Sequence, residues 1–273
     1  MNISNEGRER DKKMEKLEKC DYGKVAGLFE GTNHGIPLIY SVLEGKGAGN
    51  IYVDSVSEPQ NALILPQGGF FYLASKDHSR NFLLQVKELV FQELMPAMME
   101  KEMVLFALDE QTGKILDEIM ADRGIIRIKR TLFDFNEKRY REIQRTIVLP
   151  DGYKVLRMED AQLREYETAG NLGGHLSDRI GYRIVKGEEI ISQCISVFIG
   201  GGQAETDICT CEGYRRKGFA MACASAFIDE CLSRGLFPAW SCWPFRTESA
   251  ALARKLGFEE KGAADAHFWA ENM

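Results

Sequence analysis

The stretch Thr206–Gly235, TDICTCEGYRRKGFAMACASAFIDECLSRG, decides the fold of this chain. Its first residues continue a strand-like run that we expect to span Ala204–Cys211. Glu212-Gly213-Tyr214 then turns the chain, and small and apolar residues at helical spacing predict a helix over Gly218–Arg234. The stretch therefore predicts a strand that passes through a short turn into a long helix packed on a sheet.

The start of this helix has the chemistry of an anion site. The first N–H groups of a helix lack partners and carry partial positive charge, so a diphosphate placed there receives several hydrogen bonds. Gly218 allows close approach of the backbone, and Ala220 keeps the next turn narrow. Arg215, Arg216 and Lys217 add cationic side chains. The alternative is a basic turn before an ordinary amphipathic helix.

A second stretch, RTESAALARKLGF at Arg246–Phe258, follows the first and completes a pattern. Together the two stretches resemble the acetyl-CoA motifs of the GNAT N-acetyltransferases, the first of which has the core Gln/Arg-x-x-Gly-x-Gly/Ala. The residues that match are Arg215, Gly218 and Ala220 in the first motif and Ser249, Leu252, Lys255, Gly257 and Phe258 in the second. Around AWSCWPFRTES the chain is similar to a bacterial subgroup that includes zwittermicin-resistance acetyltransferases.

The resemblance implies a cofactor site for acetyl-CoA as cosubstrate. In the family, backbone groups of the strand before the first motif hold pantetheine, and the helix start holds the pyrophosphate. The residues implied are Cys209, Thr210, Cys211, Arg215, Arg216, Lys217, Gly218, Phe219, Ala220 and Ser249. Two positions depart from the pattern: the usual Asn of the second motif is Arg246, and a frequent Tyr, a candidate general acid, is Ala253.

Acetyl transfer to an amine needs a group that removes the proton of the amine. In the resembling family two strands splay apart to admit the cofactor, and here these are Ala204–Cys211 and Phe237–Trp243. Glu205 and Asp207 lie two residues apart on the first strand, so both point to one face of the sheet. We expect Glu205, then Asp207, as the base; solvated edge residues are the alternative. His175, in a Gly-rich loop, is a further candidate for the base. Ser241 and Cys242 could donate a proton to the departing thiolate, but a place in the core is favoured for both.

The rest of the chain predicts two halves of mixed α/β structure. Turn signals at Leu149-Pro150-Asp151-Gly152 place the boundary, giving a flexible charged arm over 1–20, a diverged GNAT-like domain over 21–150 and the GNAT acetyltransferase domain over 151–273. The second half also predicts strands at 153–158, 180–185 and 190–198 and a helix at 248–256. The first half predicts strands at 36–43, 50–56, 62–65, 69–74, 103–108 and 125–135 and helices at 79–95 and 112–120. The common element order suggests two copies of one architecture.

The first half lacks a cofactor signature. Its strand-to-helix junction, Ala74-Ser75-Lys76-Asp77-His78-Ser79, has no glycine and carries an acid where a phosphate would sit. We therefore expect this half to brace the catalytic half or to wall the acceptor site without binding acetyl-CoA.

Composition limits the class of protein. A net charge of −6 over 273 residues argues against general binding to nucleic acid or anionic membranes. The first residues lack the apolar core of a secretory signal, and no apolar run spans a bilayer, so we expect a cytoplasmic protein. The 7 cysteines lack ligand spacing with the 4 histidines, which predicts reduced cysteines and no metal site.

The sequence as a whole predicts an acetyl-CoA-dependent N-acetyltransferase. Its acceptor is an amine of a small molecule, an antibiotic or a metabolite, and the transfer is direct. Protein N-acetylation and a non-catalytic acyl-CoA-binding regulatory module are the alternatives, the second because of Ala253. The sequence does not decide the oligomeric state, for which a homodimer is one possibility.

Overall fold

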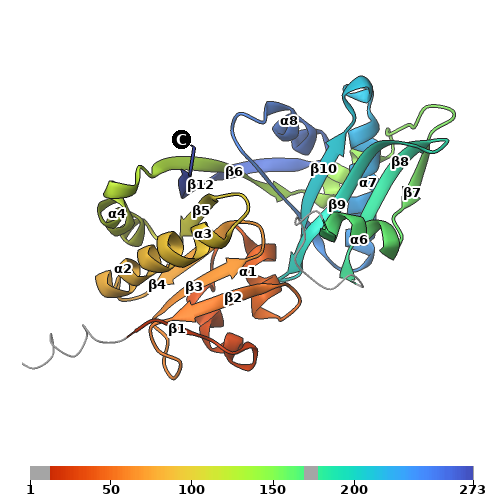
Figure 1. Cartoon of the computed structure of the whole chain (residues 1–273). Coiled ribbons are helices and arrows are strands. Elements are labelled where there is room, and N and C mark those ends of the chain that lie inside the picture. The colour runs from red at the N-terminus through yellow and green to blue at the C-terminus, as the bar shows by residue number, and fades with distance from the viewer. Residues whose placement is uncertain (1–12, 169–177, 273) are drawn as a thin grey trace, which may run out of the picture. The chain divides into compact units, whose positions relative to one another are not determined.

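The computed structural model describes residues 13–168 and 178–272 and divides them into two compact units (Figure 1). The first unit consists of residues 13–33, 42–128 and 265–272, and the second of residues 34–41, 129–168 and 178–264. Each unit has its own hydrophobic core and contributes its own strands to a 12-stranded sheet.

The second unit is built on a mixed sheet with the strand order β12-β6-β11-β10-β9-β8-β7. From β6 to β7 the neighbours pair antiparallel except β10 and β11, which run parallel. The strands are β6 (Ile126–Phe135), β7 (Lys154–Arg157), β8 (Gly181–Lys186), β9 (Glu189–Gly200), β10 (Gln203–Thr210), β11 (Phe237–Cys242) and β12 (Phe258–Ala270). The helices are α5 (Glu137–Gln144), α6 (Asp160–Thr168), η5 (Glu212–Tyr214), α7 (Phe219–Ser233) and α8 (Thr247–Lys255).

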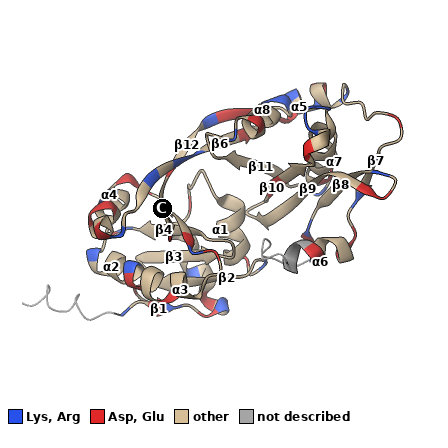
Figure 2. Ribbon diagram, turned by 45° about the horizontal axis from the view of Figure 1, so that its top comes forward, with Lys and Arg blue, Asp and Glu red and all other residues tan. Residues whose placement is uncertain are grey.

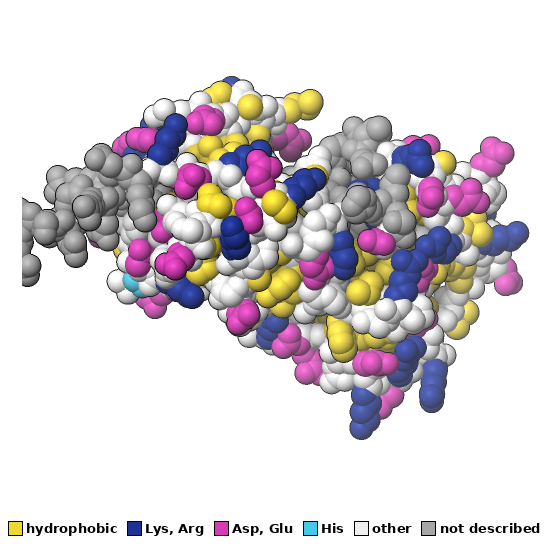
Figure 3. All heavy atoms as spheres, turned by 90° about the horizontal axis from the view of Figure 1, so that it is seen from below, with side chains coloured by type: hydrophobic (Ala, Val, Ile, Leu, Met, Phe, Trp, Pro, Cys, Tyr) yellow, Lys and Arg dark blue, Asp and Glu magenta, His cyan; other side chains and the backbone are white. Residues whose placement is uncertain are grey.

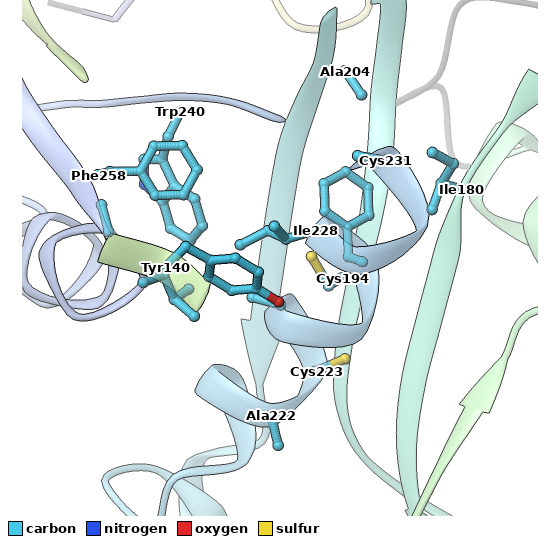
Figure 4. Close-up of a cluster of buried hydrophobic side chains, with 14 of the residues drawn as sticks. Tyr140, Ile180, Cys194, Ala204, Ala222, Cys223, Ile228, Cys231, Trp240 and Phe258 are labelled. Atoms are coloured by element: carbon cyan, nitrogen blue, oxygen red, sulfur yellow. The ribbon is translucent and has the colours of Figure 1, made fainter. Parts of the chain in front are cut away.

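The core of the second unit lies between the long helix α7 and one face of this sheet. Phe219, Cys223, Phe227 and Cys231 of α7 are buried there, and the small residues between them allow close packing. Figure 4 shows the ring of Tyr140, from α5, pointing toward α7. Its hydroxyl group lies within hydrogen-bonding distance of two side chains. It can exchange a hydrogen bond with Oγ of Ser225, or donate one to Oδ1 of Asp229 at 3.0 Å.

The first unit repeats this plan on a smaller sheet with the order β1-β2-β3-β4-β5-β12. Here β4 and β5 are the parallel pair. The strands are β1 (Glu15–Lys16), β2 (Gly49–Val53), β3 (Asn61–Pro66), β4 (Phe70–Ser75) and β5 (Glu102–Ala107). The helices are η1 (Lys19–Leu28), α2 (Arg80–Glu88), the π-helix η2 (Leu89–Leu94), α3 (Met95–Ala97), α4 (Glu110–Ile119) and η3 (Ala121–Arg123); α1 (Ile36–Leu43) belongs to the second unit up to Ser41.

The compact units divide the chain differently from the predicted boundary at residue 150. The main segment of the second unit begins at Lys129, because β6 pairs with β11 and because Phe133 and Tyr140 are buried in its core. Strand β12 is shared: up to residue 264 it belongs to the second unit, and its last residues pair with β5 in the first. Residues 15–16, predicted as part of a flexible arm, form β1 against β2, and Leu17 is buried.

Two further elements differ from the sequence prediction. The segment 36–43, predicted as a strand, is helix α1, because Leu38, Ile39 and Val42 are buried at helical spacing. A short apolar run does not distinguish a strand from a buried helix. Helix α5 is absent from the sequence prediction because Tyr140 is its buried residue and the other residues, apart from Ile143, are polar.

Acidic and basic residues are interspersed along the ribbon of both units (Figure 2), and their side chains are interspersed on the face shown in Figure 3. Within residues 13–168 and 178–272, the structure contains no helix with the length and apolarity needed to cross a bilayer.

Candidate active site

The parallel strands β10 and β11 separate partway along their length. Their pairing runs from Gln203↔Phe237 to Glu205↔Ala239, although β10 continues to Thr210 and β11 to Cys242. Beyond this point β10 pairs with β9 and β11 pairs with β6. The register of β10 shifts between Ala204 and Thr206, which is a bulge, and a bulge bends its strand. The predicted splayed pair is therefore present in the second unit.

The main chain of β10 faces the opening at alternate residues. The N–H of Cys211 donates to Ile191 of β9, so alternation along an antiparallel pair turns Ile208 and Thr210 away from β9. The carbonyl of Thr210 accepts a hydrogen bond from Nε of Arg215, which agrees with this direction. Of the three residues predicted to hold pantetheine, Thr210 thus presents its main chain to the opening, and alternation adds Ile208, which the sequence analysis missed.

The turn after β10 leads into an uncapped helix start. Gly218 is the N-cap of α7 with a φ of 87°, and Arg216 is also left-handed with a φ of 62°. A Cβ built on Gly218 would meet nothing within 4 Å, so space lies open above the first turn. Arg215, Arg216 and Lys217 are exposed around this space. Exposed amides at a helix start and cationic side chains fit a diphosphate.

A carboxylate lies at the point where the strands separate. Glu205 is 9% exposed, and its Oε1 accepts a hydrogen bond of 2.9 Å from Oγ of Ser241 on β11. Burial raises the pKa of Glu205, and the Arg130 guanidinium, with Nη2 4.0 Å from Oε1, opposes that shift. Ala204 and Trp240, the neighbours in sequence of these residues, are in the core on the α7 side. Glu205 and Ser241 therefore lie on the face away from α7.

The other catalytic candidates have different surroundings. Asp207 is exposed, and the protein around it still raises the pKa of its carboxyl group by desolvation. Cys242 is in the core, and burial raises the pKa of its thiol, so it stays protonated. His175 lies outside the described residues.

The remaining predicted residues line the core side of the site. The Phe219 side chain is buried, with its ring centroid 4.5 Å from that of Tyr153, so the main chain of this residue is what faces the helix start. The hydroxyl of Ser249 accepts a hydrogen bond from the indole of Trp240 at 3.2 Å. Ala253 is fully buried in the core, which leaves no room for a tyrosine at that position.

The corresponding place in the first unit is closed. Strands β4 and β5 pair up to Leu73↔Ala107, the last residue of β5, and Leu108 continues the ladder by donating to Leu73. The side chain of Ser79 caps α2 by accepting from the N–H of Phe82. The carboxylate of Asp77 accepts from the N–H of Ser79. Protein groups thus occupy the amides that a phosphate would need.

Within the described parts of the chain, no group of three or more His, Cys, Asp and Glu side chains is arranged to hold a metal ion. The chemistry available at the splayed strands is that of one buried carboxylate, a hydroxyl, a guanidinium and a helix start.

A splayed parallel pair that leads into an open, uncapped helix start defines a class of acyl-CoA-dependent transferases, and the chain belongs to the GNAT acetyltransferase family. The sequence model of that family matches residues 26–266. The chain is 27% identical over 256 residues to the uncharacterized N-acetyltransferase YdfB of Bacillus subtilis (strain 168). The aligned region covers 90% of this chain and 95% of YdfB.

Solved structures show the same fold. A GCN5-related N-acetyltransferase-like protein from Streptococcus suis 89/1591 is 25% identical and superposes with a TM-score of 0.67, covering 91% of this chain and 98% of that protein. A tandem GNAT protein from the clavulanic acid biosynthesis pathway, at 13% identity, has a TM-score of 0.59 and covers 94% and 98%. The predicted mixed α/β GNAT fold with two related halves is therefore confirmed, and family membership implies acyl transfer from acyl-CoA.

Proposed function

We propose that the chain is an acetyl-CoA-dependent N-acetyltransferase that acetylates an amine of a small molecule, an antibiotic or a metabolite, by direct transfer. The observation that carries the proposal is the buried Glu205 at the point where β10 and β11 separate. The resemblance of AWSCWPFRTES to zwittermicin-resistance acetyltransferases supports the small-molecule acceptor.

Two parts of the site bind acetyl-CoA, the start of α7 and the main chain of β10. The amides at the start of α7, with Arg215, Arg216 and Lys217, hold the diphosphate. Main-chain groups of Ile208 and Thr210 hold the pantetheine arm in the opening between the strands. The bound cosubstrate supplies an acyl thioester.

Glu205 acts as the general base. An ammonium substrate is unreactive until it loses a proton, and a carboxylate with a raised pKa accepts that proton more readily than an ordinary one. The neutral amine forms its N–C bond while the C–S bond of the thioester breaks, and the second proton that the nitrogen loses goes to the departing sulfur, which leaves as a thiol. The amine proton passes from Glu205 to water. Asp207, on the same strand, strengthens the attraction for a cationic acceptor.

A binding assay followed by a turnover screen tests the proposal. Acetyl-CoA is expected to raise the melting temperature of the chain, since saturation at a hundredfold excess over Kd stabilises by about 2.7 kcal/mol. A library of amines is then screened for release of free thiol, with Glu205→Gln as the variant that binds and turns over slowly. No thermal shift at millimolar acetyl-CoA would contradict the proposal.

A non-catalytic acyl-CoA-binding module is the second candidate, favoured by the buried Ala253 in place of the family's tyrosine. Binding of acetyl-CoA without thiol release across the whole amine library would support this alternative.

A further inference from the structure

Arg130 of β6 reaches the candidate base from outside the two sequence motifs. Its Nε donates to Oγ of Ser241 at 2.9 Å, and its Nη2 donates to the carbonyl of the same residue at 3.4 Å. Its Cζ lies 4.8 Å from the centroid of the Trp243 ring. A guanidinium held by two hydrogen bonds and an aromatic face has few remaining orientations.

These contacts fix the direction of the hydrogen bonds. A guanidinium only donates, so Oγ of Ser241 accepts from Arg130. The single proton of that hydroxyl is then directed to Oε1 of Glu205, 2.9 Å away. The hydrogen bond and the ion pair both reach Oε1, which leaves Oε2 to receive the substrate proton.

We propose that Arg130 is a positioning residue for the general base, holding the Glu205 carboxylate ionised and oriented through Ser241. The inference rests on the proposed function, because it assigns Glu205 the role of base. It adds a residue from β6, which the sequence analysis placed in the other half of the chain.

The charged and polar groups that act on Glu205 come from three strands. Arg130 from β6 and Ser241 from β11 favour the carboxylate, whereas burial and Asp207, from its own strand β10, favour the carboxylic acid. Removal of Arg130 and removal of the Asp207 charge therefore shift the titration of Glu205 in opposite directions. A residue with a purely structural role would not produce this pair of signs.

The test uses the full chain labelled with [δ-13C]glutamate and requires no acceptor. The carboxyl resonance that disappears in Glu205→Gln is followed against pH in the wild type and in the variants. Arg130→Met is expected to raise the titration midpoint of Glu205 by about one pH unit or more, since an opposite charge at this range lowers a carboxyl pKa by roughly 1–3 units. Asp207→Asn is expected to lower the titration midpoint of Glu205, and Arg130→Lys is expected to leave that midpoint near the wild-type value.

Arg139→Met is the matched control, because it removes the same charge from an exposed ion pair with Glu259. An unchanged midpoint in Arg130→Met, or an equal shift in Arg139→Met, overturns the inference. If Arg130→Met does not fold, Ser241→Ala decides, with a midpoint above that of the wild type expected and an unchanged one overturning the inference.

Turnover provides the second readout. With acetyl-CoA and the amine that gives the fastest thiol release in the screen, Arg130→Met should lower kcat at pH 7, recover it as the pH rises, and leave the KM for acetyl-CoA unchanged. A chain that turns over no amine refutes the proposed function, whereas the carboxyl titration still decides the coupling of Arg130 to Glu205.

Discussion

At the scale of single residues, Gly218 has a left-handed backbone conformation, which other residues disfavour, and empty space where a Cβ would lie. Its φ of 87° disfavours any side chain, so Gly218→Ala is expected to cost about 1–2 kcal/mol of stability. The new Cβ would project into the space above the helix start and weaken acetyl-CoA binding at least tenfold, or about 1.4 kcal/mol. Urea denaturation and titration calorimetry measure the two effects.

Gly235→Ala is the matched control for this prediction. Gly235 follows the same helix, has a φ of 71° and has nothing within 4 Å of a built Cβ. It should lose similar stability and keep its affinity for acetyl-CoA. Equal losses of affinity in both variants would show that the helix start is not the diphosphate site.

Because burial raises its pKa, Glu205 is expected to lower the stability of the fold at neutral pH. A raised carboxyl pKa means that the folded state holds its proton over a pH window in which the unfolded state has lost it. Stability therefore falls as the pH rises from the ordinary glutamate pKa through the raised one. Glu205→Gln avoids this loss and is expected to melt above the wild type at pH 8, with the gap closing as the pH falls. A gap that widens on acidification would contradict the prediction.

The residues of the site were predictable where their contacts are local in sequence. The loop around Gly218 follows its strand directly, so spacing alone placed it at a helix start. Arg130 could not be found in this way, because it bonds Ser241 across 111 positions. The fully buried Ala253 shows the same limit, since only the packing of the core reveals why that position carries no larger side chain.

At the scale of elements, the two parallel strand pairs predict different responses to acetyl-CoA. Strands β10 and β11 stop pairing partway along their length, whereas β4 and β5 stay paired up to Ala107, the last residue of β5. Acetyl-CoA is expected to slow amide hydrogen exchange at Ile208, at Thr210 and in the first turn of α7. Exchange in β4 and at the start of α2 should not change.

Hydrogen exchange read by mass spectrometry of peptides from both units measures this contrast. Protection of peptides around residues 70–83 by acetyl-CoA would contradict the assignment of the first unit as a non-binding half. Glu205→Gln serves as the control that still shows protection around residues 208–222, since that variant keeps the binding residues.

The elements themselves were predictable to different degrees. The helix predicted at 79–95 starts where it was expected, because the Ser79 side chain caps α2. The run Ile36–Leu43 is ambiguous because a short, mostly apolar run suits a strand or a buried helix equally. The close approach of α1 to Gly200 decides the outcome, since a Cβ there would lie 2.2 Å from the backbone nitrogen of Ser41.

At the scale of the whole molecule, the closing strand of the first unit comes from the end of β12. His267–Ala270 pair with β5, and the Trp269 ring packs edge-on against Phe91 at 5.3 Å. Deletion of residues 265–273 is therefore expected to remove the slow amide exchange of β5 and to leave that of β8 and β9 intact. Deletion of residues 271–273, which follow the strand, is the control. Unchanged protection of β5 after the longer deletion would contradict the pairing.

The shared strand also sets an order of events during synthesis. A nascent chain emerges from the ribosome with its first residues leading, at about 5–20 residues per second. The sheet edge at β5 stays without its neighbour until residues 265–270, which follow the whole of the second unit in sequence, have also emerged. The sheet of the first unit is thus completed only after the residues of the second unit have been made, and until then the edge at β5 exposes unpaired N–H and C=O groups.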